Sequence, residues 1–181
     1  VGGLAVALAL QDTLSNLFAG IHIIASKKIR TGDFIRLEGG QEGHVEDISW
    51  RNTTIRTLAN FIYIVPNNKL STMIVTDFDQ PQTEMSITVE LGVAFDSDLN
   101  KVERVTVEVA REALQTVAGA VPEYEPSVRF SRFAESQITF SVVLRIRTFV
   151  DQYLLRHEFI KRLQERYQRE GILIPYPIRT V

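Results

Sequence analysis

The chain has 181 residues, 45% of them hydrophobic and 23% charged, with a formal net charge of -2. This composition is typical of a folded protein that buries a core, and it excludes a disordered tail or a collagen-like fibre. The absence of cysteine excludes a disulfide framework, thiol catalysis and a cysteine-ligated zinc site. The near-neutral charge gives no reason to expect a nucleic-acid partner.

Charged residues are distributed unevenly and divide the chain into three segments. Residues 1–32 hold three bases and one acid, and the three bases come together near the end of the segment. Residues 33–83 hold four bases and seven acids, and residues 84–181 hold thirteen bases and fourteen acids. The sequence therefore predicts an apolar segment followed by two nearly neutral soluble domains. Because the chain starts inside an apolar run without a methionine, we expect it to be part of a longer protein.

The first ten residues contain only valine, glycine, leucine and alanine. A run of ten is too short to span a bilayer by itself. Leu4 and Leu8 lie four positions apart and therefore share one face of a helix. Small residues, which let helix backbones approach closely, recur beside them: Gly3, Ala5, Ala7 and Ala9. If identical helices surround an axis, the two leucines form stacked apolar rings, and such constrictions stop ions by dewetting.

A polar break at Gln11-Asp12-Thr13 separates this run from a second helical pattern. The second pattern places one apolar stripe at Leu14, Leu17, Phe18, Ile21, Ile24 and Ala25. Asp12 is suited to cap the start of the second helix, and Lys27 and Lys28 are suited to its C-terminal end. The sequence therefore predicts two helices with a bend between them.

Residues 33–83 predict a small five-stranded β barrel of the Sm/SH3-like kind. The expected strands are Phe34–Leu37, Gly43–Ser49, Thr53–Leu58, Phe61–Val65 and Met73–Phe78. Gly39-Gly40 and Ala59-Asn60 supply turns between them. Strands this short and closely spaced favour a barrel.

Residues 84–181 predict a ferredoxin-like βαββαβ domain. The expected elements are a strand over Met85–Val93, a helix over Asp98–Val117, strands over Val128–Phe133 and Ile138–Arg147, a helix over Gln152–Arg169 and a strand over Ile172–Pro175. Gly171 is expected to end the second helix.

The sequence does not predict a catalytic site. The three histidines, His22, His44 and His157, lie far apart without metal-ligand spacing, so we expect no metal. No phosphate-binding loop and no G-x-S-x-G motif is present, and Asp96 and Asp98 stand where they can cap a helix. We therefore expect a protein that is not an enzyme and has no cofactor.

Three other interpretations remain open from the residues alone. The apolar N-terminal segment can be the core helix of a soluble protein. The chain can be a soluble oligomeric ring scaffold that binds RNA through its β barrel, but the excess of acids in residues 33–83 opposes this. The ferredoxin-like half can carry an enzyme, since that fold hosts many chemistries, although no catalytic constellation supports it.

Seven motifs in series resemble the small-conductance mechanosensitive channel family (MscS-like) and cover essentially the whole chain. They are Gly3–Gln11, Leu14–Gly20, Arg30–Asp33, Thr53–Thr57, Ile64–Lys69, Gly92–Asp98 and the terminal Gly171-Ile172 with Pro175-Tyr176-Pro177. The resemblance implies a homoheptamer in which residues 1–32 form a kinked, pore-lining helix belonging to a larger transmembrane domain. Residues 33–83 and 84–181 then form the β and αβ domains of a cytoplasmic vestibule with side portals.

The resemblance also implies roles for single residues. Leu4 and Leu8 form the hydrophobic gate, with Gly3, Ala5 and Ala7 as helix-packing positions. Bends are expected at Gln11, Asp12 and Gly20, and membrane-surface bases at Lys27, Lys28 and Arg30. The channel opens under membrane tension in hypoosmotic stress and releases ions and small solutes. Its expected partners are other copies of the chain and membrane lipids, without nucleic acid. It is expected in the inner cell membrane as a multi-pass protein with residues from about 33 onward in the cytoplasm, or in an organellar membrane.

Overall fold

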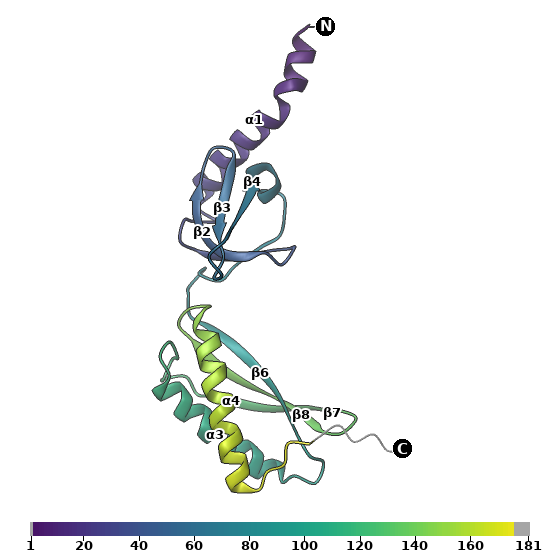
Figure 1. The fold of residues 1–181 in the computed structure, drawn as a ribbon, viewed down its shortest axis with the longest axis vertical. Helices are drawn as coiled ribbons and strands as arrows, with labels where there is room; N and C mark the ends of the chain where they lie inside the picture. Colours follow the sequence, from purple (N-terminus) through teal and green to yellow (C-terminus); the bar gives the residue numbers. More distant parts are fainter. Residues whose placement is uncertain (1, 176–181) are drawn as a thin grey trace. The chain divides into compact units, whose positions relative to one another are not determined.

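A computed structural model describes residues 2–175 of the chain, which divides into two compact units, Val1–Gln82 and Thr83–Val181 (Figure 1). The first unit holds one long helix and a five-stranded sheet, and the second holds a three-stranded sheet with two helices. The predicted order of an N-terminal helix, a β unit and an α+β unit is therefore confirmed.

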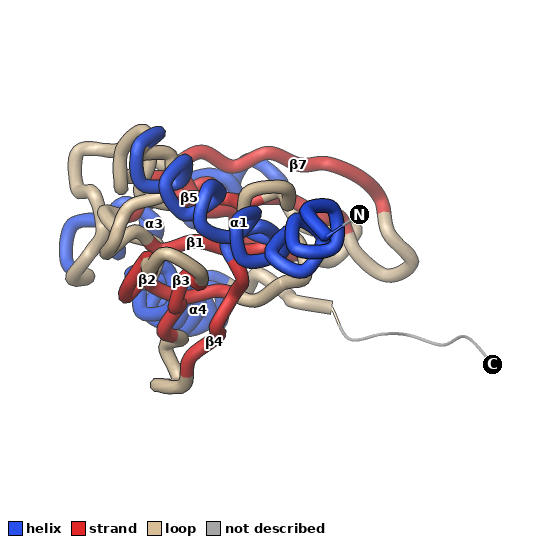
Figure 2. Tube along the Cα trace, turned by 90° about the horizontal axis from the view of Figure 1, so that it is seen from above, coloured by secondary structure: helices blue, strands red, loops and turns tan. Residues whose placement is uncertain are grey.

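The N-terminal helix α1 runs without interruption from Gly2 to Ser26, and Figure 2 draws it as helix throughout. The predicted division into two helices at Gln11 and Asp12 is wrong. These residues include no glycine or proline, and their side chains stay exposed, so a polar stretch is no obstacle to helical hydrogen bonding. Asp12 is not an N-cap: its carbonyl oxygen accepts a hydrogen bond of 2.9 Å from Asn16 Nδ2 one turn later.

The sheet of the first unit contains all five predicted strands. They are β1 (Phe34–Leu37), β2 (Glu42–Ile48), β3 (Asn52–Arg56), β4 (Ile62–Pro66) and β5 (Val75–Asp77), in the order β4-β3-β2-β1-β5 with antiparallel neighbours. The predicted turns contain Gly40 and Asn60 with positive φ values of 86° and 66°. The sheet is open, so the predicted barrel is wrong in this detail. β5 has only three residues and pairs with β1, and the short helix α2 (Asn67–Leu70) follows β4.

The core of the first unit combines the inward side chains of the sheet with one residue from each helix. Ile35, Val45 and Ile55 come from three adjacent strands and are fully buried or nearly so. Ile23 of α1 and Leu70 of α2 pack against them. The C-terminal half of α1 is therefore part of the folded β unit.

The second unit packs two helices against one face of a sheet. The elements are β6 (Met85–Val93), α3 (Leu99–Thr116), β7 (Ser127–Phe133), β8 (Ile138–Ile146) and α4 (Asp151–Glu170), with strand order β6-β8-β7. Alternate residues of β8 are buried, as expected of a sheet covered on one side. The two helices share a buried hydrogen bond between Thr106 Oγ1 and Tyr167 Oη, and burial raises the pKa of Tyr167 to about 12.

In the second unit, the predicted start of α3 and the predicted end of α4 are confirmed, but the predicted last strand is not. Asp98 caps α3 by accepting the backbone N–H groups of Asn100 and Lys101, and Gly171 ends α4 in the left-handed conformation with φ 68°. Residues 172–175 form no strand. A single backbone bond of 3.2 Å, from Ala94 N–H to Leu173 carbonyl, joins this segment to the end of β6. One bond is too few for a ladder.

Candidate functional site

Helix α1 exposes apolar side chains along its whole length. Only Asn16, Gly20 and Ile23 are buried among its described residues. At 25 residues it is about 37 Å long, which exceeds the hydrocarbon thickness of a bilayer of about 30 Å. Within the part of the chain that the structure describes, it is the one helix long and apolar enough to cross a membrane. All described residues of its first half are exposed, so the surface of this half is free for partners.

The predicted gate residues lie on one side of this free half. Leu4 and Leu8 are 68% and 62% exposed, and their spacing of four residues aligns them along the helix. The predicted packing residues Gly3, Ala5 and Ala7 are also exposed, and a Cβ added at Gly3 would meet no atom within 4 Å. The structure therefore leaves these five residues exposed on α1.

Gly20 occupies a close contact between α1 and the β unit. A Cβ added there would lie 2.6 Å from Asn67 Nδ2, 2.9 Å from the carbonyl oxygen of Trp50 and 3.2 Å from that of Ser49. The helix continues through Gly20 without a break, and the bend expected at this position stays a prediction. The absence of a side chain at Gly20 lets the backbone of α1 approach the backbone of Ser49 and Trp50 closely.

A network of asparagine side chains fixes this contact. Asn67 is fully buried; its Oδ1 accepts a hydrogen bond of 2.9 Å from Thr53 Oγ1, and its Nδ2 donates one of 2.8 Å to the Ser49 carbonyl. Asn16 Oδ1 accepts the backbone N–H of Asn68 at 3.0 Å, which ties α1 to the first turn of α2. These directional bonds define one position of the helix on the β unit.

The same contact contains one unsatisfied polar atom. Asn68 Oδ1 is buried and has no hydrogen-bond partner among the described residues. An unpaired buried oxygen costs about 1–3 kcal/mol, and this cost disappears when the oxygen becomes hydrated.

The three predicted basic residues follow the end of α1. Lys27 adopts a left-handed conformation with φ 52° directly after the helix, and Arg30 Nε donates to the Lys27 carbonyl at 3.2 Å. Lys27, Lys28 and Arg30 are all exposed. Cations at this end interact favourably with the helix dipole and leave a positive cluster at one end of an apolar helix.

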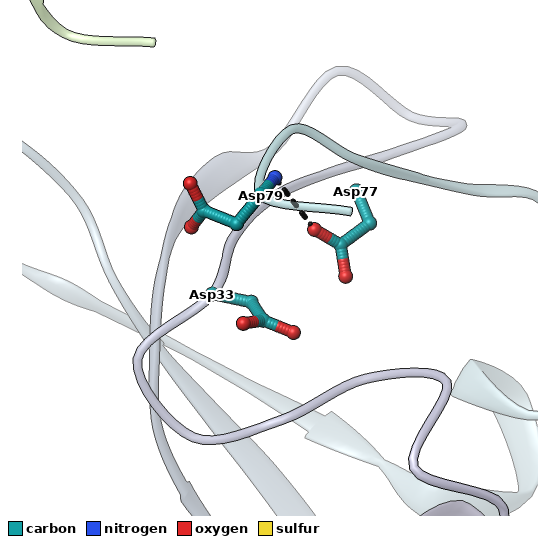
Figure 3. Close-up of side chains that lie close together, drawn as sticks. All are labelled: Asp33, Asp77 and Asp79. Atoms are coloured by element: carbon teal, nitrogen blue, oxygen red, sulfur yellow. Dashed lines mark hydrogen bonds between the residues drawn. The ribbon is translucent and has the colours of Figure 1, made fainter. Parts of the chain in front are cut away.

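Three carboxylates, from Asp33, Asp77 and Asp79, meet beside this cluster (Figure 3). One oxygen atom from each lies within 4.8 Å of the others, and such oxygens suit a hard cation. Each carboxylate already accepts donors from the chain: Asp33 from the Arg30 N–H, Asp77 from the Asp79 N–H, and Asp79 from the Phe34 N–H. This aspartate cluster is thus a hydrogen-bonded junction between the end of α1 and the end of β5, and we assign no metal to it.

Burial, together with the neighbouring Asp33 charge, raises the pKa of Asp77. Because the folded state then holds a proton more tightly than the unfolded state, the first unit gains stability as the pH falls through this raised pKa. Asp77→Asn removes the charge, so we expect slightly higher stability near pH 7, by less than about 1 kcal/mol, and a flatter pH dependence. Urea unfolding followed by Trp50 fluorescence, between about pH 4 and 8, measures this.

Asp47→Asn, at an exposed acid of β2 outside the cluster, is the matched control for that experiment. It should leave the pH dependence of stability as it is in the unchanged chain. Equal pH dependence in the Asp77→Asn variant and the unchanged chain would contradict the assignment.

The sequence interpretation missed the helix–sheet contact. The apolar stripe of the second helical pattern does not face the β unit: Leu14, Phe18, Ile21 and Ile24 are exposed, and Asn16, Gly20 and Ile23 form the buried face. The signal was present as an asparagine and a glycine spaced by four in an otherwise apolar helix. Asn16 and Gly20 thus identify the face that meets other backbone.

Two family models match most of the chain. One, described as the β-domain of a mechanosensitive ion channel, matches residues 12–78, and the other, the C-terminal part of the mechanosensitive ion channel MscS, matches residues 87–174. The matches cover both the β unit and the α+β unit, and the first includes the half of α1 that carries Asn16 and Gly20.

Full-length relatives are similar over the whole chain. The large-conductance mechanosensitive channel MscMJLR of Methanocaldococcus jannaschii is 32% identical over 189 residues, which cover 100% of this chain and 50% of the relative. The low conductance mechanosensitive channel YnaI of Escherichia coli is 31% identical over 184 residues, covering 100% and 53%. The chain therefore spans about half the length of the curated relatives it matches.

Solved structures share the fold. Helicobacter pylori MscS in a closed state superposes with a TM-score of 0.83 at 23% identity, covering 99% of this chain and 68% of that one. Arabidopsis thaliana MSL1 superposes with a TM-score of 0.72 at 21% identity, covering 97% and 63%. The arrangement of one long helix, a β unit and an α+β unit is common to all three.

Proposed function

The chain belongs to the MscS family of mechanosensitive ion channels, and we propose that it supplies the pore-lining helix and the cytoplasmic vestibule of such a channel. The channel opens under membrane tension, as in hypoosmotic stress, and lets ions and small solutes leave the cell. The family consists of ion channels and not enzymes. By extension, this chain carries no catalytic activity and needs no cofactor.

One observation carries the proposal: an exposed apolar helix with two aligned leucines is anchored at its other end in a folded β unit. In a soluble monomer the apolar surface of α1 would stay exposed to water. In a ring of helices, by contrast, Leu4 and Leu8 face a common axis. Two stacked leucine rings make a neck that water leaves, and ions do not cross it. The small residues Gly3, Ala5 and Ala7 then let neighbouring helices pack closely enough to close that neck.

Self-association is supported by the edge of the first unit's sheet. β4 is an edge strand, and its residues Ile62 and Ile64 are 45% and 61% exposed, with Phe61 beside them at 52%. An exposed apolar edge strand is a template for pairing with another chain. We assign a homoheptamer, in which seven copies of the 20.5 kDa chain weigh about 144 kDa. Native mass measured in mild detergent tests this, and a monomer would contradict it.

The exposed bases Lys27, Lys28 and Arg30 support a position of the end of α1 at the cytoplasmic membrane surface, because bases interact with anionic lipid headgroups. Residues from about 33 onward then lie in the cytoplasm, as a β domain over 33–83 and an αβ vestibule domain over 84–181. The whole protein is a multi-pass protein of the inner cell membrane, with an organellar membrane as the second location. Its partners are other copies, membrane lipids, permeant ions and small solutes.

The gate is tested by replacing Leu8 with serine in the full-length channel. A polar ring is wetted more easily than an apolar one, so Leu8→Ser is expected to leak at rest or to open at a clearly lower tension. Patch-clamp recording from reconstituted liposomes measures both the leak and the threshold.

Leu10→Ser is the matched control, because the same chemical change then lies on the opposite side of the helix from Leu8. It should leave the channel closed at rest. A Leu8→Ser channel with a normal threshold and no leak would show that Leu8 is not the seal, while native mass would still report on assembly separately.

A soluble ring scaffold that binds RNA remains the second interpretation, and no observation favours it. The strand-rich part of the first unit carries more acids than bases, whereas a phosphate-binding surface needs an excess of bases.

A further inference from the structure

The three-stranded sheet of the second unit has one face without a helix. Along β8 the buried residues alternate with half-exposed ones, and the buried set packs in the core with α3 and α4. The opposite face carries Thr139, Ser141, Val143 and Arg145, and no described helix covers it. Figure 1 shows α3 and α4 side by side along the sheet. The free face is mostly polar, which suits contact with a solute.

A groove of about 750 Å³ crosses this free face. It takes residues from all three strands, among them Thr88, Glu90, Arg132, Thr139 and Ser141, and Gln137 from the turn before β8. Gly92 belongs to its floor, and a Cβ there would collide with the side chain of Gln137. The glycine therefore lets an amide side chain lie flat in the groove beside the hydroxyl groups.

Two opposite charges stand on the two sides of this groove. Glu90 is paired with Ser141 in the β6–β8 ladder, and Arg132 with Thr139 in the β7–β8 ladder. Two strand spacings of about 4.8 Å, and an offset of two residues along the strands of about 6.8 Å, separate their backbones by about 12 Å. Neither charge takes part in an ion pair with another residue in the described range 2–175. On the same face, Arg145 is paired with Glu84 at 2.9 Å.

We propose that this groove binds a small zwitterion, with its ammonium group at Glu90 and its carboxylate at Arg132. A guanidinium group binds a carboxylate through two parallel hydrogen bonds, and a carboxylate accepts the donors of an ammonium group. Because Glu90 and Arg132 stand apart and do not pair with each other, a ligand whose own charges are separated by a short carbon chain fits both. Binding at this groove does not depend on the channel activity proposed above.

The probe is 5-aminovalerate, a short zwitterion with separated charges, titrated into the isotope-labelled 181-residue chain in mild detergent. We expect saturable chemical-shift changes confined to backbone amides of the groove, at and near Gly92 and Thr139. Pentanoate and pentylammonium have the same chain length with one charge each, and they are expected to bind at least tenfold more weakly. Glu90→Gln and Arg132→Gln should each weaken binding of the zwitterion by about tenfold.

Arg145→Gln is the matched control, since it removes a charge from the same face outside the groove. It should bind the zwitterion as the unchanged chain does. The proposal is overturned if no chemical shift saturates at zwitterion concentrations up to 100-fold above about 1 mM. It is also overturned if pentanoate binds as well as the zwitterion, or if both groove variants bind the zwitterion normally. Because both groove residues are exposed, the variants should keep the fold, and unchanged amide shifts elsewhere verify this.

Discussion

Replacing Asn67 with alanine is expected to destabilise the first unit by about 2–5 kcal/mol. The substitution leaves one buried and one half-buried group unpaired, because the Thr53 hydroxyl loses its acceptor and the Ser49 carbonyl loses a donor. Both Thr53 and Asn67 are 0% exposed, so water does not replace the lost bonds without opening the structure. The single tryptophan of the chain, Trp50, lies in this unit, and its fluorescence during urea unfolding measures the loss.

Asn68→Ala is the matched control, at the neighbouring residue of the same helix. Its side-chain oxygen is unpaired, and the bond to Asn16 uses the backbone N–H, which alanine keeps. We expect a change within about 0.5 kcal/mol, or a small gain in stability. Similar losses in the two variants would show that the buried network does not hold the unit together. A double-mutant cycle with Thr53→Val then isolates the Thr53–Asn67 bond.

Most of the fold could be predicted from the sequence because local signals and tertiary packing agree. Strand β1 has the predicted bounds Phe34–Leu37, and β6 has the predicted bounds Met85–Val93. Asp98 and Gly171 cap helices where the sequence placed them, since caps depend on a single side chain or a single left-handed residue. The apolar spacing of α3 and α4 likewise fixes which faces are buried.

The errors arise where a local signal competes with longer-range interactions. A polar run at Gln11-Asp12-Thr13 resembles a helix boundary. Exposed polar side chains do not interrupt a helix, however, and α1 continues through them. Barrel closure depends on two strands that are distant in sequence, and a three-residue β5 with α2 after β4 leaves the sheet open. Residues 172–175 contain strand-forming types, yet only Leu173 bonds to the sheet.

The proposed gate residues and the anchoring residues differ in how far the sequence reveals them. Leu4 and Leu8 are visible as a spacing in an apolar run, whereas the role of Asn16 depends on a partner 52 residues later. A hydrophobic pattern along the sequence cannot reveal a hydrogen bond between residues so far apart. In the structure, the same helix thus carries a free apolar end and an end fixed by polar contacts. In the proposed channel, a change in the position of α1 on the β unit is therefore the movement that would couple the pore to the vestibule.

Gly20→Ala is expected to weaken this anchoring by about 1–3 kcal/mol, although alanine favours helix by about 1 kcal/mol over glycine. The added Cβ meets two backbone carbonyl oxygens, of Trp50 and Ser49, which have little room to shift. Gly20→Val adds two further methyl groups at the same contact and should cost more. The Trp50 emission maximum should change with each variant, since the Trp50 carbonyl lies at the contact.

Gly3→Ala is the control for the intrinsic helix effect, because a Cβ at Gly3 meets nothing within 4 Å. It should not lower the stability detected by Trp50, and any gain should stay within the intrinsic helix preference of about 1 kcal/mol. In the full-length channel, Gly20→Ala is further expected to shift the tension threshold while leaving the single-channel conductance unchanged, because the substitution alters the anchor and not the pore lining. A Gly20→Ala chain as stable as the unchanged one, with a normal threshold, would mean that the neighbouring loop of Ser49 and Trp50 yields to the added carbon and that close approach is not what this glycine provides.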